Sequence, residues 1–186
     1  MANSANVTTG KPMIGGAVHV APKNTTLPTD PTTALDSAFA DLGYMSDAGV
    51  TNDLSRSTTD IKAWGGDVVL TTQTEKKDEW KYTMIEAKNI NVLKQVFGEE
   101  NVSETGGVIT IVSNSKELER NSWVFDMLLS EEYVKRVVLP DAQIVNVDTI
   151  SYTDSAAVGY AVTLKAYPDE SGNTHYEYIS AGTGSV

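Results

Sequence analysis

The chain contains no cysteine and only two histidines, His19 and His175, among its 186 residues. Without cysteine, disulfide bonds and thiolate metal sites are excluded, and two histidines are too few for a histidine-rich metal site. Both histidines are flanked by residues typical of strands, which predicts solvent-exposed strand positions for them. General-base catalysis needs a positioned partner, and the sequence supplies none. We therefore expect no catalytic residue, no metal and no cofactor.

Basic residues are also scarce. Lys and Arg number 14 against 25 Asp and Glu, which gives a formal net charge of −11. Binding to phosphates needs clustered Lys and Arg, so the composition argues against a nucleic-acid-binding protein and fits a surface that repels DNA. No run reaches the ~20 apolar residues of a membrane span, and the first residues lack the basic start and apolar stretch of a signal peptide. We therefore expect a protein made and kept in a cytoplasm.

Motifs of common enzyme classes are missing as well. Thr9-Gly10-Lys11 is followed by proline and lacks the upstream glycine of a phosphate-binding loop, and there is no Gly-x-Ser-x-Gly elbow. Paired carboxylates could still support acid–base hydrolysis. The candidate carboxylates are Asp67, Asp78, Glu79, Glu86 and Asp126. Asp126 alternates with apolar neighbours in a predicted strand, and this alternation places it toward solvent or an interface.

What the sequence does contain is a series of β-strand patterns. A chain of 186 residues can bury about 70% of its unfolded surface, enough for one domain with arms. Alternation and β-branched runs predict strands at residues 13–20, 58–64, 68–74, 79–86, 108–112, 122–129, 133–139 (ended by proline), 143–153, 157–167 and 175–180. Residues 44–54 are predicted to contain a short strand and a turn at Asp47-Ala48-Gly49. Because no strand–helix–strand alternation is present, we expect a mainly antiparallel β protein.

One short helix is predicted at about residues 91–97. Its apolar stripe consists of Val92, Leu93, Val96 and Phe97. Asn89 or Asn91 can cap its first turn, and Gly98 stands where a left-handed C-cap is favoured. A helix of about two turns is not stable alone, so we expect it to lie on a sheet.

Segments rich in small and polar residues flank the predicted domain. We interpret residues 1–12 as an N-terminal arm, 13–180 as the β domain and 181–186 as a C-terminal tail. Within the domain, three prolines in residues 21–42 exclude a central strand and predict a long loop of the kind that is usually functional or disordered. Part of this loop, from Thr32 onward, could hold a helical turn capped by Asp30 or Thr32.

A turn at Gly65-Gly66-Asp67 between two β-branched runs predicts a hairpin, because primed turns need positive φ. Trp64 lies at the entrance to this turn and could be an interface anchor, since tryptophan is enriched at binding hot spots. Trp80 and Trp123 lie on alternating apolar faces and are expected in the core. Alternatively, the three tryptophans could form the sugar-binding platform of a carbohydrate-binding or adhesion module.

Several stretches resemble the major tail tube proteins of siphophages, in the order and chain length of that family. They are Ala21-Pro22, Leu27-Pro28-Thr29-Asp30, Ala34-Leu35-Asp36, Leu42-Gly43-Tyr44, Lys62-Ala63-Trp64-Gly65-Gly66-Asp67, Ile85-Glu86, Val92-Leu93, Val96-Phe97-Gly98 and Gly172-Asn173-Thr174. The resemblance implies an antiparallel β-sandwich or partly open barrel, with one short helix packed at its side and an extended loop and arms. It also implies that the protein is not an enzyme.

The resemblance further implies a function in assembly. Members of the family form hexameric rings that stack into a long, non-contractile tail tube, and each subunit gives strands to a continuous inner barrel. The acidic lumen conducts double-stranded DNA during genome ejection without binding it specifically. Implied partners are further copies of the chain, the tape-measure protein, the tail initiator or distal tail protein and the tail terminator. The implied location is a virion tail assembled in the host bacterial cytoplasm, with no membrane contact.

Contacts between subunits are expected from the long loop, the hairpin turn and the two termini. The residues predicted to make them are Leu27, Pro28, Leu35, Phe39, Trp64, Gly65, Gly66 and Asp67. The strands at residues 143–153 and 157–167 are expected to line the lumen, because they are the longest predicted strands and both of their faces are only half apolar.

Overall fold

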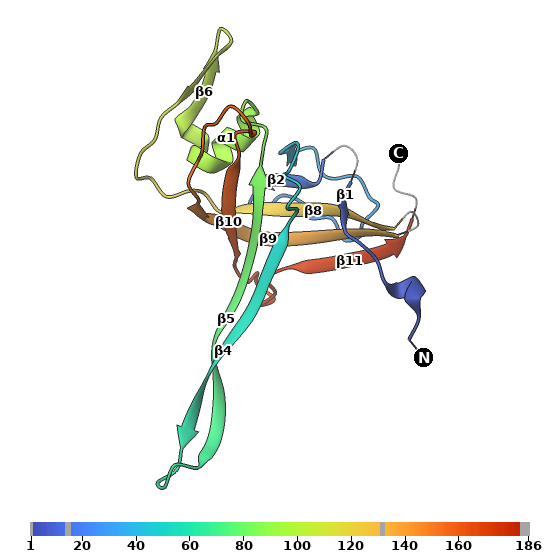
Figure 1. Ribbon diagram of the computed structural model, residues 1–186, viewed down its shortest axis with the longest axis vertical. Helices are drawn as coiled ribbons and strands as arrows, with labels where there is room; N and C mark the ends of the chain where they lie inside the picture. The colour runs from blue at the N-terminus through green and yellow to red at the C-terminus, as the bar shows by residue number, and fades with distance from the viewer. Residues whose placement is uncertain (1, 14–15, 131–132, 183–186) are drawn as a thin grey trace.

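The computed structural model describes residues 2–13, 16–130 and 133–182, which form a mainly β, antiparallel structure with one α-helix (Figure 1). The strands are β1 (Lys11–Pro12), β2 (Val18–Pro22), β3 (Ala40–Asp41), β4 (Thr51–Lys62), β5 (Val68–Met84), β6 (Val102–Thr105), β7 (Val108–Ile111), β8 (Asn121–Ser130), β9 (Tyr133–Val147), β10 (Tyr160–Ala166) and β11 (Tyr176–Ala181). The helices are α1 (Ile90–Phe97) and the 3₁₀ turns η1 (Ser4–Asn6) and η2 (Glu99–Asn101). Most of the expected C-terminal tail and residues 14–15 of the first predicted strand lie outside the described residues.

The main sheet has the order β3-β2-β8-β9-β10-β5-β4, with β1 added beside β8 and β11 beside β9. β9 changes neighbours along its length: Tyr133–Val138 pair with β11, and Ala142–Val147 pair with β10. The sheet therefore turns at β9, so that β8, β9 and β11 cross the direction of β10, β5 and β4 (Figure 1). This arrangement confirms the expected β-sandwich with a short helix, and the described strands do not close into a barrel.

Pro140 does not end a strand, contrary to the sequence-based expectation for residues 133–139. β9 runs through it to Val147. The register of β8 against β9 shifts between Asn121 and Trp123, which marks a bulge at the level of the proline. Proline is tolerated at bulges because the strand ladder needs no N–H there. The predicted strands at 133–139 and 143–153 are thus largely one strand.

The core lies between the crossing layers of the sheet. Trp80 and Trp123 are 4% and 1% exposed, which confirms their predicted core positions. Trp80 stacks on Phe125 with ring centroids 5.1 Å apart. Tyr82 also contacts Phe125, edge to face, at 5.6 Å. The alternation of apolar residues along β5 and β8 was therefore a reliable guide to this face of the sheet.

The predicted helix is confirmed as α1, beside the core. The Asn89 side chain accepts a hydrogen bond from the Asn91 backbone N–H at 3.0 Å and caps the first turn. Gly98 follows the last turn with φ 103°. The possible helical turn from Thr32 onward is not helical; that segment consists of bends, a turn and irregular backbone up to β3. No helix in the described part of the chain is long and apolar enough to cross a membrane.

The Tyr82 hydroxyl is buried without a hydrogen-bond partner among the described residues, and burial raises the pKa of Tyr82 well above its usual value. A buried, unpaired polar group costs about 1–3 kcal/mol. We expect Tyr82→Phe to keep the aromatic packing and to raise the free energy of unfolding by about 1 kcal/mol, measured by urea denaturation. A decrease of similar size would contradict this assignment.

Candidate functional site

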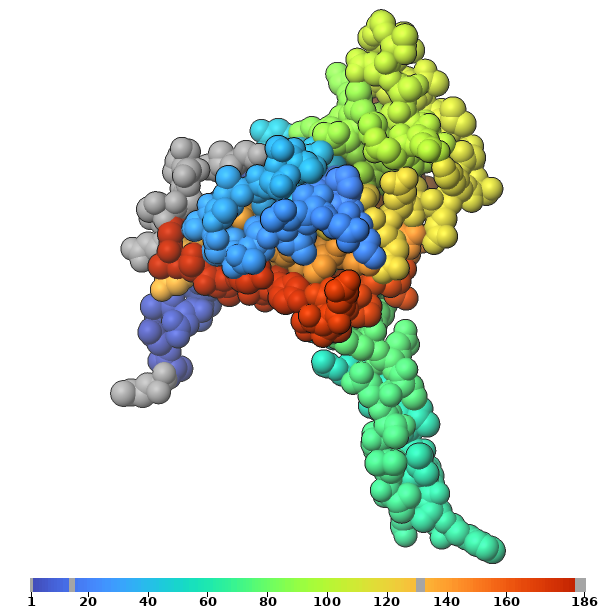
Figure 2. Space-filling model, turned by 180° about the vertical axis from the view of Figure 1, so that it is seen from behind, coloured from blue at the N-terminus to red at the C-terminus, as the bar shows by residue number. Residues whose placement is uncertain are grey.

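β4 and β5 form a hairpin that leaves the body as a two-stranded ribbon (Figures 1 and 2). Every residue from Thr51 to Lys76 is exposed. The two strands pair from Thr51 opposite Lys81 to Lys62 opposite Val68. The predicted strands at 58–64 and 68–74 form the far part of this hairpin. They continue without a break into the segments predicted as separate strands near its base.

Six exposed apolar side chains lie along the hairpin, one near its base and five in its outer part. They are Leu54, Ile61, Trp64, Val68, Val69 and Leu70. Ile61 and Leu70 are directly opposite each other in the ladder. A two-stranded hairpin is marginally stable in water on its own, and exposed apolar residues gathered in one element mark interaction sites. The hairpin therefore has the properties of a surface that another chain completes.

The tip of the hairpin presents a tryptophan. Trp64 is fully exposed, at 106% of its reference area. Gly65 and Gly66 have φ values of 114° and 101°, a region that favours glycine, and the Ala63 N–H donates to the Asp67 carbonyl at 2.8 Å. These features confirm the predicted hairpin turn.

The outer edge of β4 is a second feature of this surface. β4 ends the strand order of the main sheet and pairs only with β5 among the described strands. Its outer N–H and C=O groups face away from the sheet along Thr51–Lys62. A long free edge is a template for pairing with another strand. The hairpin thus offers both backbone and side-chain groups to a partner.

The segment predicted as a long loop, residues 21–42, includes the end of β2 and all of β3, and it lies against the body of its own chain (Figure 2). Of the four loop residues predicted to contact other subunits, Pro28 is buried, and Leu27, Leu35 and Phe39 are half-buried. The remaining predicted contacts, from Trp64 to Asp67, are exposed at the hairpin tip. The structure therefore separates these residues into a packed group and a projecting group.

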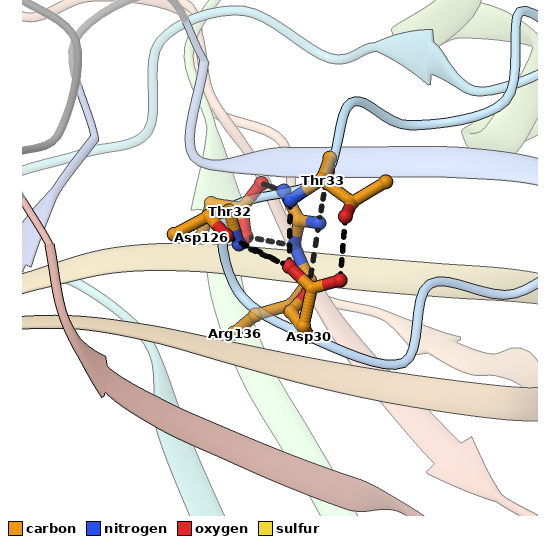
Figure 3. Close-up of polar contacts among 5 residues, drawn as sticks. All are labelled: Asp30, Thr32, Thr33, Asp126 and Arg136. Carbon is orange, nitrogen blue, oxygen red and sulfur yellow. Dashed lines mark hydrogen bonds and ion pairs between the residues drawn. The ribbon is translucent and has the colours of Figure 1, made fainter.

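A buried ion pair fastens the loop. Arg136 and Asp126 are 5% and 4% exposed, and the guanidinium Nε and Nη2 contact the two carboxylate oxygens at 2.7 and 2.9 Å (Figure 3). Nη1 of the same arginine donates to the carbonyls of Asp30 and Thr33 at 3.1 and 2.7 Å. The expectation that Asp126 faces solvent or an interface is therefore wrong. Alternation separates two faces of a strand but does not show that the loop covers the second face.

Asp30 stabilises the turn that Arg136 holds (Figure 3). Its Oδ1 accepts hydrogen bonds from the backbone N–H groups of Thr32 and Thr33, both at 2.7 Å. The Thr33 hydroxyl donates to Oδ2 at 2.5 Å. These hydrogen bonds, first those from Thr33, hold the pKa of Asp30 well below its usual range. The predicted capping function of Asp30 is real, but it caps a turn instead of a helix.

The base of the hairpin contains another buried carboxylate, Asp78, which is 2% exposed. It accepts hydrogen bonds from Asn52 and Trp80 and lies 2.6 Å from Nδ1 of His175. Burial alone would raise the pKa of Asp78, but hydrogen bonds from His175, Thr174 and Asn52 outweigh it and lower this pKa to about 2. His175 is accordingly half-buried and bound to Asp78, so the expectation of a solvent-exposed strand position for it is wrong.

The other candidate carboxylates have separate partners. Glu79 pairs with Lys77 at 2.9 Å, Glu86 accepts from the Tyr44 N–H at 2.9 Å, and Asp67 lies exposed at the hairpin tip. Within residues 2–13, 16–130 and 133–182, no group of three or more His, Asp or Glu side chains is arranged to hold a metal ion. Two of the three tryptophans are in the core, so the three do not form a sugar-binding platform.

The two strands expected to line a lumen exist in shortened form. The second half of β9 pairs with β10, from Ala142 opposite Ala166 to Val147 opposite Val162. Residues 148–159 connect them without strand structure. Side chains along β10 alternate between buried and half-buried positions, so one face of this pair belongs to the core and the other is partly open.

Comparisons with known proteins give a family match. Residues 1–185 match the family model described as phage tail tube protein. No curated protein matches the chain. Similar solved structures include the tube-terminating cap of the anti-feeding prophage, with 10% identity, a TM-score of 0.45 and coverage of 98% of this chain and 100% of that one.

Two further similar structures come from the PVC extracellular contractile injection system in its extended state. Its sheath/tube terminator has 9% identity and a TM-score of 0.43, and covers 92% of this chain and 98% of that one. Its sheath–tube complex has 8% identity and a TM-score of 0.44, and covers 98% of this chain and 100% of that one. Because all three TM-scores lie below 0.5, the assignment rests on the family model.

Proposed function

Because the chain belongs to the phage tail tube protein family, we propose that it is the repeating subunit of a long, non-contractile siphophage tail tube. In this proposal, hexameric rings of the chain stack around a lumen that conducts double-stranded DNA during genome ejection. The coarser function, a structural component of a virion tail, follows from the family itself. A non-enzymatic role is part of the same proposal.

The projecting β4–β5 hairpin is the observation that carries this proposal. All of its residues from Thr51 to Lys76 are exposed, so its apolar side chains and the outer edge of β4 contribute little to the stability of a single subunit. When the hairpin of each subunit lies on the body of the next, the contact is heterologous, and heterologous contacts close into rings. Ring closure also removes the free strand edge from solvent.

The charge of the chain supports a role in DNA passage. With a net charge of −11, the protein presents few groups that would neutralise phosphates and retain DNA. We propose that the open faces of β10 and of the second half of β9 line the lumen, as the sequence predicted for these segments. DNA would then pass without specific binding.

Contacts between stacked rings are assigned to the arms and the long loop. Residues 2–10 are exposed, and we propose that the N-terminal arm (1–12) and the C-terminal tail (181–186) reach neighbouring rings. Leu27, Leu35 and Phe39 are half-buried, so part of each side chain remains open to a neighbour. The tube ends would meet the tail initiator or distal tail protein and the tail terminator, with the tape-measure protein inside during assembly in the host cytoplasm.

Electron microscopy of the purified protein tests the proposal directly. At increasing protein concentration we expect rings or tubes about a hundred ångströms across, the size expected for six compact domains of this length. Addition of the tail initiator and the tape-measure protein should lower the concentration at which they form. A protein that stays monomeric at every concentration, even with these partners, would contradict the proposed function.

A further inference from the structure

We propose that Asp78 is a positioning residue that fixes the direction in which the β4–β5 hairpin leaves the body and thereby controls assembly of the chain. The inference rests on the proposed function, because it assigns to that function a residue distant from any contact surface. Asp78 itself is enclosed and touches no other subunit in this assignment. Asp78 affects assembly only by setting the direction of the hairpin, which makes the contact.

Asp78 stands where the hairpin changes from exposed to buried. All residues of β5 up to Lys76 are exposed, whereas Asp78 and Trp80 are 2% and 4% exposed. Beyond this point the hairpin acts as a lever of about 40 Å, at a strand rise of about 3.3 Å per residue. A rotation of about 10° at the base displaces the tip by about 7 Å on this length. A small change in backbone angle at Asp78 therefore moves Trp64 by a large distance.

The carboxylate joins both hairpin strands at one of its oxygens. Asn52 of β4 donates its side-chain N–H to Oδ1 at 2.8 Å, and the Trp80 indole N–H donates to the same oxygen at 3.1 Å. Asn52 also donates to the Glu79 carbonyl at 3.2 Å. β4 and β5 are thus fixed to each other by side chains as well as by the backbone ladder.

The other oxygen joins the hairpin to the segment before β11. The Thr174 hydroxyl donates to Oδ2 at 2.5 Å, and Nδ1 of His175 lies 2.6 Å from it. An ionised carboxylate only accepts hydrogen bonds, so Nδ1 of His175 is the donor in this contact. The Lys76 ammonium adds a hydrogen bond to Thr174 at 3.1 Å, and the His175 ring packs edge-on against Trp80 at 5.5 Å.

A buried carboxylate is costly unless it is fully hydrogen-bonded, and an apolar residue would fill the same place without that cost. A fully satisfied polar network, however, has one geometry, whereas apolar contacts tolerate several. The four donors around Asp78 come from β4, from β5 and from the segment before β11. Such an arrangement specifies the angle between hairpin and body more strictly than packing does.

Asp78→Asn is the test variant, with Glu100→Gln as its matched control. The amide keeps an acceptor for Asn52 and Trp80 but places N–H donors toward Thr174 and His175, so the two charge-assisted hydrogen bonds to the segment before β11 are lost. Glu100 undergoes the same change from carboxylate to amide, but it lies outside the hairpin, the long loop and the arms, where it makes an exposed ion pair with Lys116. We expect Asp78→Asn to raise the protein concentration needed for tube formation at least about tenfold, because a smaller fraction of subunits has a correctly directed hairpin. The control should assemble like the wild type.

A distance measurement separates positioning from stability. Because the chain has no cysteine, spin labels attach only at the two cysteines that are introduced. These are Asp67→Cys on the hairpin tip and Ile179→Cys on β11. In the monomer, double electron–electron resonance should give a narrow distance distribution for the wild type and the control. Asp78→Asn should broaden it. Thr174→Val removes the two hydrogen bonds that the Thr174 hydroxyl makes with Asp78 and Lys76. It should broaden the distribution to a smaller extent, and it covers the case in which Asp78→Asn does not fold.

Wild-type assembly and wild-type distances in Asp78→Asn would overturn the inference and leave the proposed function intact. If Asp78→Asn does not fold, an unchanged distribution in Thr174→Val overturns it. If the wild type itself forms no tubes, the proposed function fails, and the inference about assembly fails with it. In that case the distances still show whether Asp78 directs the hairpin.

Discussion

Replacing residues 57–75 with Asn-Gly is expected to abolish ring and tube formation while the body remains folded. Arg56 and Lys76 are directly opposite in the hairpin ladder, so a two-residue turn can reconnect them. The removed residues are all exposed, and their loss takes nothing from the core. Electron microscopy and sedimentation velocity should show a monomer at concentrations where the wild type forms tubes, and thermal unfolding should show a body of unchanged stability.

A single substitution tests how much the hairpin tip contributes to assembly. Trp64→Ala removes the fully exposed side chain at the tip, and a hot-spot tryptophan contributes about 2 kcal/mol or more to an interface. The concentration needed for assembly should therefore rise roughly thirtyfold. Tyr152→Ala, which removes another exposed aromatic ring outside every proposed contact, is the control and should assemble normally. Tubes formed by the shortened chain would contradict the assignment of the hairpin.

Arg136→Met is expected to lower the free energy of unfolding by about 3–5 kcal/mol, the usual cost of leaving one partner of a buried ion pair alone. The substitution leaves Asp126 buried and unpaired, and it removes the donor to the carbonyls of Asp30 and Thr33. Domains are commonly stable by only about 5–15 kcal/mol, so this is a large share of the total. Urea denaturation measures the change.

Two further variants test the reason for this loss. Arg136→Met combined with Asp126→Leu replaces both charges with apolar groups and should recover most of the stability, because such replacements are often neutral. Lys116→Met removes one partner of an exposed ion pair with Glu100 and should have little effect, as is usual for surface pairs. An Arg136→Met protein as stable as the wild type would contradict the stabilising role of the Arg136–Asp126 ion pair.

Local patterns predicted the parts of the fold whose causes are local. The helix is set by Asn89 before it and Gly98 after it, and the hairpin turn by Gly65-Gly66. The core positions of Trp80 and Trp123 follow from alternation along single strands. In each case, the residues that determine the structure lie within a few positions of one another.

The parts that could not be predicted depend on contacts between distant residues. Asp126 and Arg136 are covered by a loop about a hundred positions away, and Asp78 meets His175 from a separation of 97 residues. The residue pattern of one strand cannot show that a distant segment covers that strand or binds to it. The length of the hairpin was also hidden, because a ribbon exposed on both faces has no core-facing alternation to reveal it.

The hairpin has a consequence for how such a protein can evolve. Residues 51–76 are exposed and contribute little to the stability of the body, whereas the core and the Arg136–Asp126 ion pair contribute little to the hairpin tip. Selection can therefore lengthen, shorten or rewrite the hairpin with little loss of folding. Compatibility between subunits of different lineages can diverge in this one segment, while the body that carries it stays the same.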